Sequence, residues 1–406
     1  MRPILFILSL IISINSLFAQ QANRYFDEGT EKMKIKDYKA SINLFSRVLT
    51  INPSFFQANL ERGRCYELIG KNDSALIDYT TAIEKHKNYP NAYFYRGRFF
   101  YQQKEYKNAL EDLNKAIDLK NDVPDAWNTR ASVHQALNNH QNAIQDFSKT
   151  LELKPNQADV YQKRGDSYAA IQQTKNAVDD YSKALKINPK TGVLHYKRGL
   201  IYQKEGNYEK ALIDYTNAIK NNYESEDLYF RKADCNYILK KMTDAIADYS
   251  VLIDKYKLKS ADIFQKRGSA YMFLSDFQSA LKDYNKAIQY DKNSYQTYLQ
   301  RGLLNAKMNK TTQAIGDFNK AADIHPKYAE PHLEKGKLYF DTKKYKQAIE
   351  SLDIAIKLDS KMAETYFYRG ACKDFLKDSK GACQDLKKAA ELGHAEATEI
   401  SKVKCK

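Results

Sequence analysis

The sequence predicts an all-α protein in which one helical hairpin of 34 residues is repeated about eleven times. Three observations support this fold class. A small residue recurs every 34 positions, with one step of 35, at Gly29, Gly63, Gly97, Ala131, Gly165, Gly199, Ala233, Gly268, Gly302, Gly336 and Gly370. A second small residue follows each of these marker residues by 12 positions, and a large apolar residue comes four positions later. Such a period is typical of stacked hairpins that bury their apolar faces against their neighbours.

The segment 196–219 shows why the repeated unit is helical. Tyr196, Gly199 and Tyr202 are spaced three apart, and the apolar residues from Tyr208 to Ile219 follow the i, i+3/i+4, i+7 pattern of an amphipathic helix. A glycine within a helix costs about 1 kcal/mol, so its presence needs a packing reason. We therefore expect Gly199 and Ala211 to lie at the closest contact between two antiparallel helices.

The first element is a predicted secretory signal peptide at residues 1–19. Met1-Arg2-Pro3 precedes a short apolar run, Ile4 to Ile14, and Ala19 precedes a polar residue, which favours cleavage after Ala19. The run is short for a membrane span, but retention of this segment as an N-terminal anchor stays open. No cysteine follows the run, so a lipid anchor is not expected. The mature protein is thus predicted to be exported, to the periplasm, the outer membrane or the medium.

The remaining chain divides into repeats and a cap. Prolines at positions 53, 155, 189 and 326 end their repeats, and the one extra residue falls in the loop at 254–260. A stripe of Ala397, Ile400 and Val403 predicts a capping helix at residues 397–406. The predicted repeats are 22–55, 56–89, 90–123, 124–157, 158–191, 192–225, 226–260, 261–294, 295–328, 329–362 and 363–396.

The period and the order of aromatic, Gly, Tyr, Ala, aromatic, Ala and Pro resemble the tetratricopeptide repeat (TPR) family. A fragment, Lys387 to Ala397, is similar to the end of a Sel1-like repeat. The TPR resemblance implies a right-handed superhelical solenoid whose groove is lined by the first helix of each hairpin. Because the carboxylates recur with the repeat, whereas a catalytic site should break the period, no catalytic residues are predicted. Transferred by register, the resemblance implies that the groove contains Arg64, Phe94, Arg98, Tyr101, Asn128, Gln135, Tyr196, Phe230 and Tyr237.

Within this predicted groove, Arg64 and Arg98 lie beside Phe94 and Tyr101, a cluster suited to an extended peptide with acidic or C-terminal carboxylate groups. The chaperone-binding members of the family use Lys-x-x-x-Asn followed by Lys-x-x-x-Arg in successive first helices. That spacing is absent here, so a heat-shock-protein tail is not the expected partner.

A ladder of charges runs through the repeats. A cation precedes most marker residues, as in Arg62, and an aspartate follows most of them by 15 positions, as in Asp78. Each aspartate could meet the cation of its own repeat or of the next one. The first repeat has Glu28 and Leu44 at these positions and so lacks both partners, which favours pairing within a repeat. We expect these pairs to set hairpin register.

The composition argues against several other function classes. The net charge is +15, but cations alternate with acids, and the aromatic residues belong to the repeat core, so a nucleic-acid stripe is not predicted. No phosphate loop or nucleophile elbow is present, and no cofactor is expected. His325, Glu330 and His332 are the one cluster considered for a metal, and a surface loop explains them better. The prediction is an exported scaffold or adaptor; the alternative is an envelope-associated structural protein that holds acidic polymer or lipid through its basic surface.

The five cysteines fall into two groups. Cys65, Cys235 and Cys372 share one slot, two residues after the marker, which predicts buried and inert thiols. Cys383 and Cys405 lie at similar distances from the turn at Gly393, on helices expected to face each other. An exported chain meets oxidising conditions, so a Cys383–Cys405 bridge is the favoured pairing, with Cys372 as the competing partner.

Overall fold

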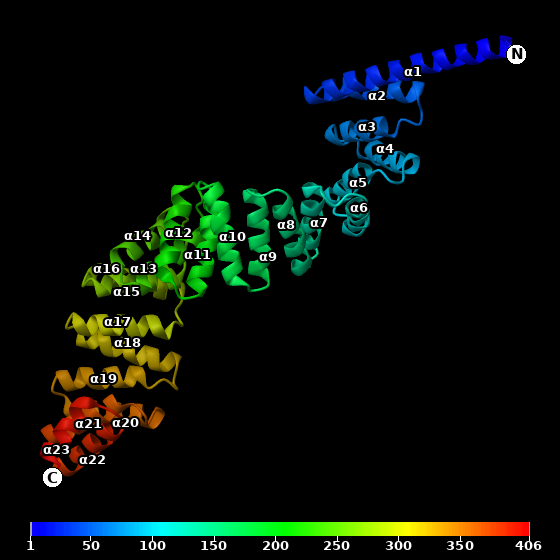
Figure 1. Cartoon of the computed structure of the whole chain (residues 1–406). Helices are drawn as coiled ribbons and strands as arrows, with labels where there is room; N and C mark the ends of the chain where they lie inside the picture. The colour runs from blue at the N-terminus through cyan, green and yellow to red at the C-terminus, as the bar shows by residue number, and fades with distance from the viewer. Residues whose placement is uncertain (1, 406) are drawn as a thin grey trace. The chain divides into compact units, whose positions relative to one another are not determined.

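The computed structural model describes the backbone of residues 2–405 and the side chains from residue 17 to 405, and this part of the chain forms 23 α-helices and no strand (Figure 1). The predicted all-α solenoid of helical hairpins is therefore confirmed. The helices are α1 (Arg2–Lys34), α2 (Tyr38–Ile51), α3 (Phe56–Leu68), α4 (Asn72–Lys85), α5 (Pro90–Gln102), α6 (Tyr106–Leu119), α7 (Pro124–Ala136), α8 (His140–Leu153), α9 (Ala158–Ala170), α10 (Thr174–Ile187), α11 (Gly192–Lys204), α12 (Tyr208–Lys220), α13 (Glu226–Ile238), α14 (Met242–Asp254), α15 (Ala261–Phe273), α16 (Phe277–Tyr290), α17 (Tyr295–Lys307), α18 (Thr311–Ile324), α19 (Glu330–Asp341), α20 (Tyr345–Leu358), α21 (Ala363–Phe375), α22 (Ser379–Glu391) and α23 (Ala395–Lys404).

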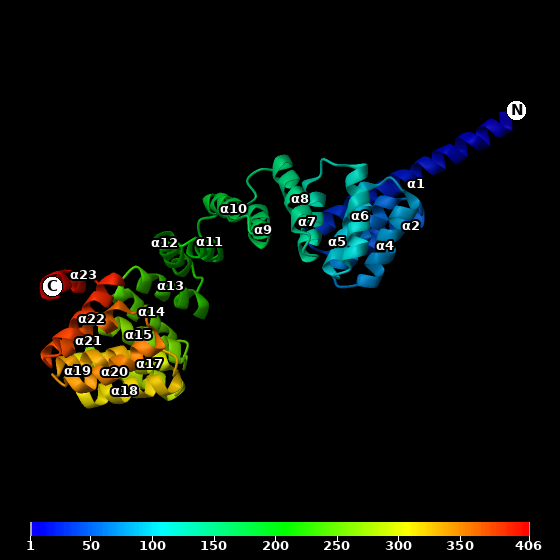
Figure 2. The same cartoon turned by 90° about the horizontal axis from the view of Figure 1, so that it is seen from below.

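The chain divides into two compact units, Met1–Ile201 and Tyr202–Lys406. Odd-numbered helices from α1 to α21 are the first helices of the eleven hairpins. Within each unit, the first helix of a hairpin packs against the even-numbered helix that follows it, as α5 does with α6 and α15 with α16. In Figure 2, helices α5 to α8 of the N-terminal unit follow one another, each beside the next. First helices of neighbouring hairpins also touch each other from α1 to α9 and from α15 to α21. First helices therefore form one wall from α1 to α9 in the N-terminal unit and another from α15 to α21 in the C-terminal unit.

A left-handed residue separates the two helices of every hairpin. It lies seven positions after the marker, where the backbone needs a positive φ to end the first helix and reverse direction. In the third hairpin Lys104 has φ 62°, and the amide of Glu105 donates to the carbonyl of Phe100 at 2.8 Å. This turn therefore recurs at a fixed register in every hairpin. The residues are Lys36, Gly70, Lys104, Asn138, Gln172, Gly206, Lys240, Ser275, Asn309, Lys343 and Lys377.

The marker glycines lie where the two helices of a hairpin are closest. A Cβ atom built on Gly63 would lie 2.9 Å from the ring of Tyr79, and one on Gly302 would lie 2.6 Å from the ring of Phe318. Real Cβ atoms do not approach other atoms so closely, so these positions favour glycine for packing. Gly199 and Ala211, predicted to occupy this contact in the sixth hairpin, are both buried.

The chain ends differ in part from the predicted boundaries. Helix α1 begins at Arg2 and continues without a break through Ala19 to Lys34. The expected signal peptide, residues 1–19, lies for the most part outside the residues whose side chains are described. At the other end, the predicted start of the capping helix at 397 is wrong. Helix α23 begins at Ala395, because the Nδ1 atom of His394 accepts a hydrogen bond from the amide of Ala397 (3.2 Å) and caps the helix there.

The extra residue of the repeat lies in the loop 255–260 between α14 and α15, as predicted. In the part of the chain searched for membrane spans, which is limited to the described residues, no helix has the length and apolar character needed to cross a bilayer.

Candidate functional site

In most hairpins the cation and the aspartate of the charge ladder pair with each other, as favoured from the sequence. In the second hairpin, Nε and Nη2 of Arg62 each donate to Asp78 at 2.8 Å, while Nη1 donates to Ser46 on the preceding second helix (3.0 Å). The arginine thus ties its own hairpin to the previous one, which fixes register rather than creating a reactive site. We call this arrangement the clamp. The ion pairs of this kind are Arg62–Asp78, Arg96–Asp112, Arg130–Asp146, Arg164–Asp180, Lys232–Asp248, Arg267–Asp283, Arg301–Asp317 and Arg369–Asp385.

The most distinctive part of the first-helix wall lies on α3 and α5 of the N-terminal unit. The guanidinium carbons of Arg64 and Arg98 lie 4.4 and 4.8 Å from the ring centroid of Tyr95. Both cations therefore contact one aromatic ring, a geometry in which each contact contributes about 0.5–1 kcal/mol where solvent reaches it. We call Arg64, Tyr95 and Arg98 the arginine–tyrosine cluster. It brings together two residues predicted for the groove and one, Tyr95, that was not.

A cavity of about 410 Å³ lies next to this cluster, between α1 and α3. Phe26 and Met33 give it an apolar wall, while Glu61 and Arg64 lie on the opposite side. Its volume falls within the range of protein ligand pockets. The combination suits a side chain of a bound segment, with polar groups nearby to fix its orientation. The lining residues are Phe26, Thr30, Met33, Lys34, Glu61 and Arg64.

Two glutamates partly neutralise the cations of the cluster. Nη1 of Arg64 donates to Glu61 at 2.7 Å, and Nη2 of Arg98 donates to Glu67 at 3.1 Å. Glu67 also accepts a 2.5 Å hydrogen bond from the Tyr79 hydroxyl. Burial raises the pKa of Glu61, although Arg64 opposes this shift. The sequence alone suggested two cations free to bind an acidic ligand. In the structure, both arginines already have a carboxylate partner.

The other predicted groove residues have packing roles in the structure. Phe94 and Tyr101 pack against the core formed by Ala109, Leu113 and Val133. Nε2 of Gln135 donates to the Lys163 carbonyl (3.0 Å) and to the Ser167 hydroxyl (3.1 Å), both on the first helix α9 of the next hairpin.

Asn128 and Tyr196 are half-buried on first helices, and the Oδ1 atom of Asn128 is buried with no hydrogen-bond partner among the described atoms. In the C-terminal unit, Phe230 and Tyr237 pack beside the buried Tyr249, and the ammonium of Lys266 lies 4.6 Å from the Phe230 ring. The predicted groove residues therefore belong to two separate sets, one in each unit.

His325 and His332, from the cluster considered for a metal, are both half-buried in the structure. The imidazole of His325 packs edge-on against Tyr328, with centroids 4.2 Å apart. Burial, followed by the nearby ammonium of Lys335, lowers the pKa of His332. Among the residues that the structure describes, no group of three or more His, Cys, Asp or Glu side chains could hold a metal ion.

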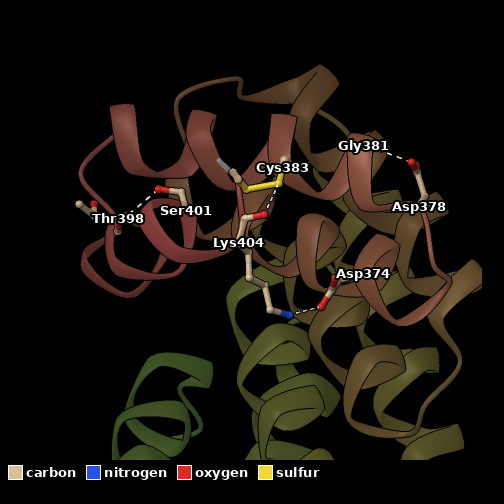
Figure 3. The surroundings of a disulfide bond; sticks show 8 residues. Asp374, Asp378, Gly381, Cys383, Thr398, Ser401 and Lys404 are labelled. Atoms are coloured by element: carbon tan, nitrogen blue, oxygen red, sulfur yellow. Dashed lines mark hydrogen bonds and ion pairs between the residues drawn. A yellow bond between two sulfur atoms is a disulfide. The ribbon is translucent and has the colours of Figure 1, made fainter.

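Cys383 and Cys405 form a disulfide between α22 and the end of α23, with Cα atoms 5.4 Å apart (Figure 3). This is the pairing favoured from register, and the competing partner Cys372 is a buried free thiol. Cys65 and Cys235 are also buried and free. Burial raises the pKa of the Cys65 thiol to about 11 and that of Cys372 to about 12. These thiols are therefore protonated at neutral pH and poor nucleophiles.

Profiles described as "Tetratricopeptide repeat" or "TPR repeat" match most of the chain, at residues 26–90, 97–138, 124–157, 165–206, 196–258, 261–294 and 329–362. No curated protein matches the chain.

Solved structures of other repeat proteins are similar at low identity. A crystal structure of MamA is 25% identical, with 43% of this chain and 94% of that chain covered and a TM-score of 0.38. A tetratricopeptide repeat protein from Parabacteroides merdae is 20% identical (61% and 99% covered, TM-score 0.45), and yeast Tom70 is 13% identical (95% and 96% covered, TM-score 0.40). Because these TM-scores are below 0.5, the structures add nothing to the assignment of a binding site.

Proposed function

The chain belongs to the tetratricopeptide repeat family, and on that premise we propose that it is an exported scaffold that binds an extended segment of a partner protein. The binding surface is the first-helix wall of the N-terminal unit, formed by α1, α3 and α5. The observation that carries the proposal is the cavity of about 410 Å³ beside the arginine–tyrosine cluster. The export part rests on the predicted signal peptide at residues 1–19.

The chemistry of this surface indicates the kind of segment that fits. Phe26 and Met33 offer apolar surface to one side chain of the segment. Only Nη1 of Arg64 donates to Glu61, and a guanidinium has five N–H donors in a planar fork. A carboxylate of the segment would therefore add hydrogen bonds to Arg64 without displacing the existing pair. The expected ligand has an apolar side chain close to an acidic group or a C-terminal carboxylate.

A photo-crosslinking amino acid at Lys34 tests the proposal in cells. Lys34 lines the cavity and is exposed, whereas Ile77 on the second helix α4 is 66% exposed and gives a matched control position. The proposal predicts partner bands from position 34 and none of the same bands from position 77. The bands should disappear when Glu61→Gln and Arg64→Gln are introduced together, since this removes the donor without leaving an unpaired charge. Identical bands from both positions would refute it.

A salt titration separates this function from the alternative that the basic surface holds acidic polymer or lipid. Attraction through exposed lysines weakens steeply as ionic strength rises, because the Debye length falls from about 10 Å at 0.1 M to about 3 Å at 1 M. Binding in the cavity depends in part on apolar contact and should survive at 0.5 M salt. Export is tested separately by the mass of the mature chain, which should begin at Gln20.

A further inference from the structure

A second cavity of about 410 Å³ lies at the C-terminal end of the first-helix wall, in the C-terminal unit. The first helices α19 and α21 give it aromatic walls, and one face of the capping helix α23 closes it. Its residues include Phe340, Phe367, Phe375, Glu396, Ile400 and Lys404. We call it the aromatic pocket.

The aromatic pocket leaves a large apolar ring open to solvent. Phe375 is 60% exposed, stacks flat on Tyr345 with centroids 4.8 Å apart, and lies 5.9 Å from the ring of Phe340. The ring of Phe340 is in turn 5.4 Å from Tyr368. These contacts hold the rings in place while leaving one of them uncovered. A preformed aromatic surface of this kind suits a large apolar side chain of a ligand.

Acidic groups mark the rim of the pocket, although the chain as a whole has a net charge of +15. Asp374 and Glu396 bring two carboxylates, and Lys404 brings one ammonium, which pairs with Asp374 (Figure 3). The rim therefore has a net charge of −1. Charge complementarity favours a ligand with a cation beside its apolar side chain.

The wall formed by α23 is held at its two ends by different contacts. At the start of the helix, His394 stacks on Phe367 with centroids 4.2 Å apart, and Ala397 is fully buried. In the last turn Val403 is 76% exposed, and the disulfide from Cys405 to Cys383 follows directly after Lys404. A helix of ten residues is not stable by itself in water. The disulfide is therefore the covalent restraint on the turn that places Lys404 at the rim, in addition to the ion pair of Lys404 with Asp374.

We propose that the aromatic pocket binds a peptide segment of a partner that carries a large apolar residue followed by a basic one, and that the Cys383–Cys405 disulfide controls this binding. The proposal does not rest on the groove of the N-terminal unit. When a dithiol reagent reduces the bond, the reagent supplies two electrons and two protons and becomes a cyclic disulfide, while the protein gains two thiols. The last turn of α23 then frays, and the pocket loses the part of its third wall that this turn supplies.

Fluorescence polarisation with a labelled peptide, Ser-Gly-Phe-Lys-Gly-Ser, tests the proposal on the mature, oxidised chain. We expect saturable binding that weakens at least tenfold with Phe375→Ala, with Glu396→Lys, and after dithiothreitol treatment. Phe273→Ala is the matched control, because Phe273 occupies the same repeat position in the eighth hairpin and is 58% exposed. This control should bind as the unmodified chain does. Cys383→Ser combined with Cys405→Ser should bind as weakly as the reduced chain and no longer respond to dithiothreitol.

Several outcomes would overturn the proposal. Equal affinity for the peptide before and after reduction would show that the disulfide does not control binding. Equal losses of affinity in Phe375→Ala and Phe273→Ala would show that the peptide does not bind in the aromatic pocket. Tighter binding of Ser-Gly-Phe-Glu-Gly-Ser would contradict the charge argument, and self-association that Phe375→Ala abolishes would make a second copy of the chain the occupant. The paired Glu61→Gln and Arg64→Gln variant should bind this peptide normally, so failure of the N-terminal groove and failure of the aromatic pocket remain distinguishable.

Discussion

The ninth and tenth hairpins lie next to each other in the C-terminal unit and differ in how their two helices are joined. In the ninth hairpin, Nε and Nη2 of Arg301 donate to Asp317 (3.0 and 2.6 Å), and Nη1 donates to Asn285 of the previous hairpin (2.7 Å). In the tenth, Lys335 donates to Asn319 of the previous hairpin (2.9 Å), and Ser351 stands where the aspartate would be.

Both hairpins nevertheless form the same structure, which shows what the clamp does and does not supply. Gly336 of the tenth hairpin approaches Leu352 as closely as Gly302 approaches Phe318, so the apolar contact alone is enough to form a hairpin. The clamp of the ninth hairpin adds an ion pair between its two helices, whereas the bond to the previous hairpin is kept in the tenth by Lys335. Without a carboxylate partner, Lys335 is a half-buried cation, and burial lowers its pKa. The tenth hairpin should therefore be the less stable of the two.

The largest test of this comparison removes the carboxylate of the ninth hairpin. Asp317→Ala leaves the guanidinium of Arg301 partly buried without its partner, and such a loss typically costs about 3–5 kcal/mol. Ser351→Ala is the matched change in the tenth hairpin. Ser351 bonds only to the carbonyl of Gln347 on its own helix, so the cost should be below about 1 kcal/mol. Hydrogen exchange of α17–α18 and of α19–α20 measures both, and equal loss of protection would contradict the comparison.

A second test concerns the glycine contact. A Cβ on Gly302 would lie 2.6 Å from the rigid ring of Phe318, whereas a Cβ on Gly336 would meet the flexible side chain of Leu352. Gly302→Ala should therefore cost about 1–3 kcal/mol through overpacking, and Gly336→Ala distinctly less. Thermal unfolding of the two variants gives the order. A larger loss for Gly336→Ala would show that the leucine cannot move aside.

These contacts also show which parts of the molecule could be predicted from the sequence. The positions of Gly302 and Asp317 follow from a period of 34, because repetition reveals which residues face each other. The partial neutralisation of Arg64 and Arg98 was harder to foresee. Glu61 and Glu67 lie at repeat positions within the predicted groove window, but their ion pairs depend on side-chain conformations that the period does not specify. Tyr95 was missed because its ring contacts two arginines, Arg64 and Arg98, that belong to different hairpins.

A third test measures how the stability of the tenth hairpin changes with pH. Burial lowers the pKa of His332 below its ordinary value of about 6.5. The unfolded chain therefore binds a proton more readily than the folded chain as the pH falls below about 6.5, and stability is lost on acidification. Protection of α19–α20 against hydrogen exchange, after correction for the intrinsic rate, should fall between pH 7.5 and 5.5. In His332→Gln this fall should shrink, and an unchanged fall would assign it to another group.

The smallest expected effect concerns the turns of the same two hairpins. Asn309 (φ 59°) and Lys343 (φ 61°) both adopt the left-handed conformation at the end of a first helix. Asparagine enters this region at lower cost, because its short polar side chain can hydrogen-bond to the local backbone, whereas a lysine pays the full steric cost between Cβ and the carbonyl oxygen. Lys343→Asn should therefore stabilise the tenth hairpin by about 0.5 kcal/mol, and Asn309→Lys should destabilise the ninth by a similar amount. The double variant should have nearly the same overall stability as the unmodified chain, because the two effects are opposite. Its hydrogen-exchange protection should decrease in α17–α18 and increase in α19–α20. Parallel shifts of both hairpins in either single variant would mean that the two unfold as one cooperative unit, and the difference in clamps would then not divide them.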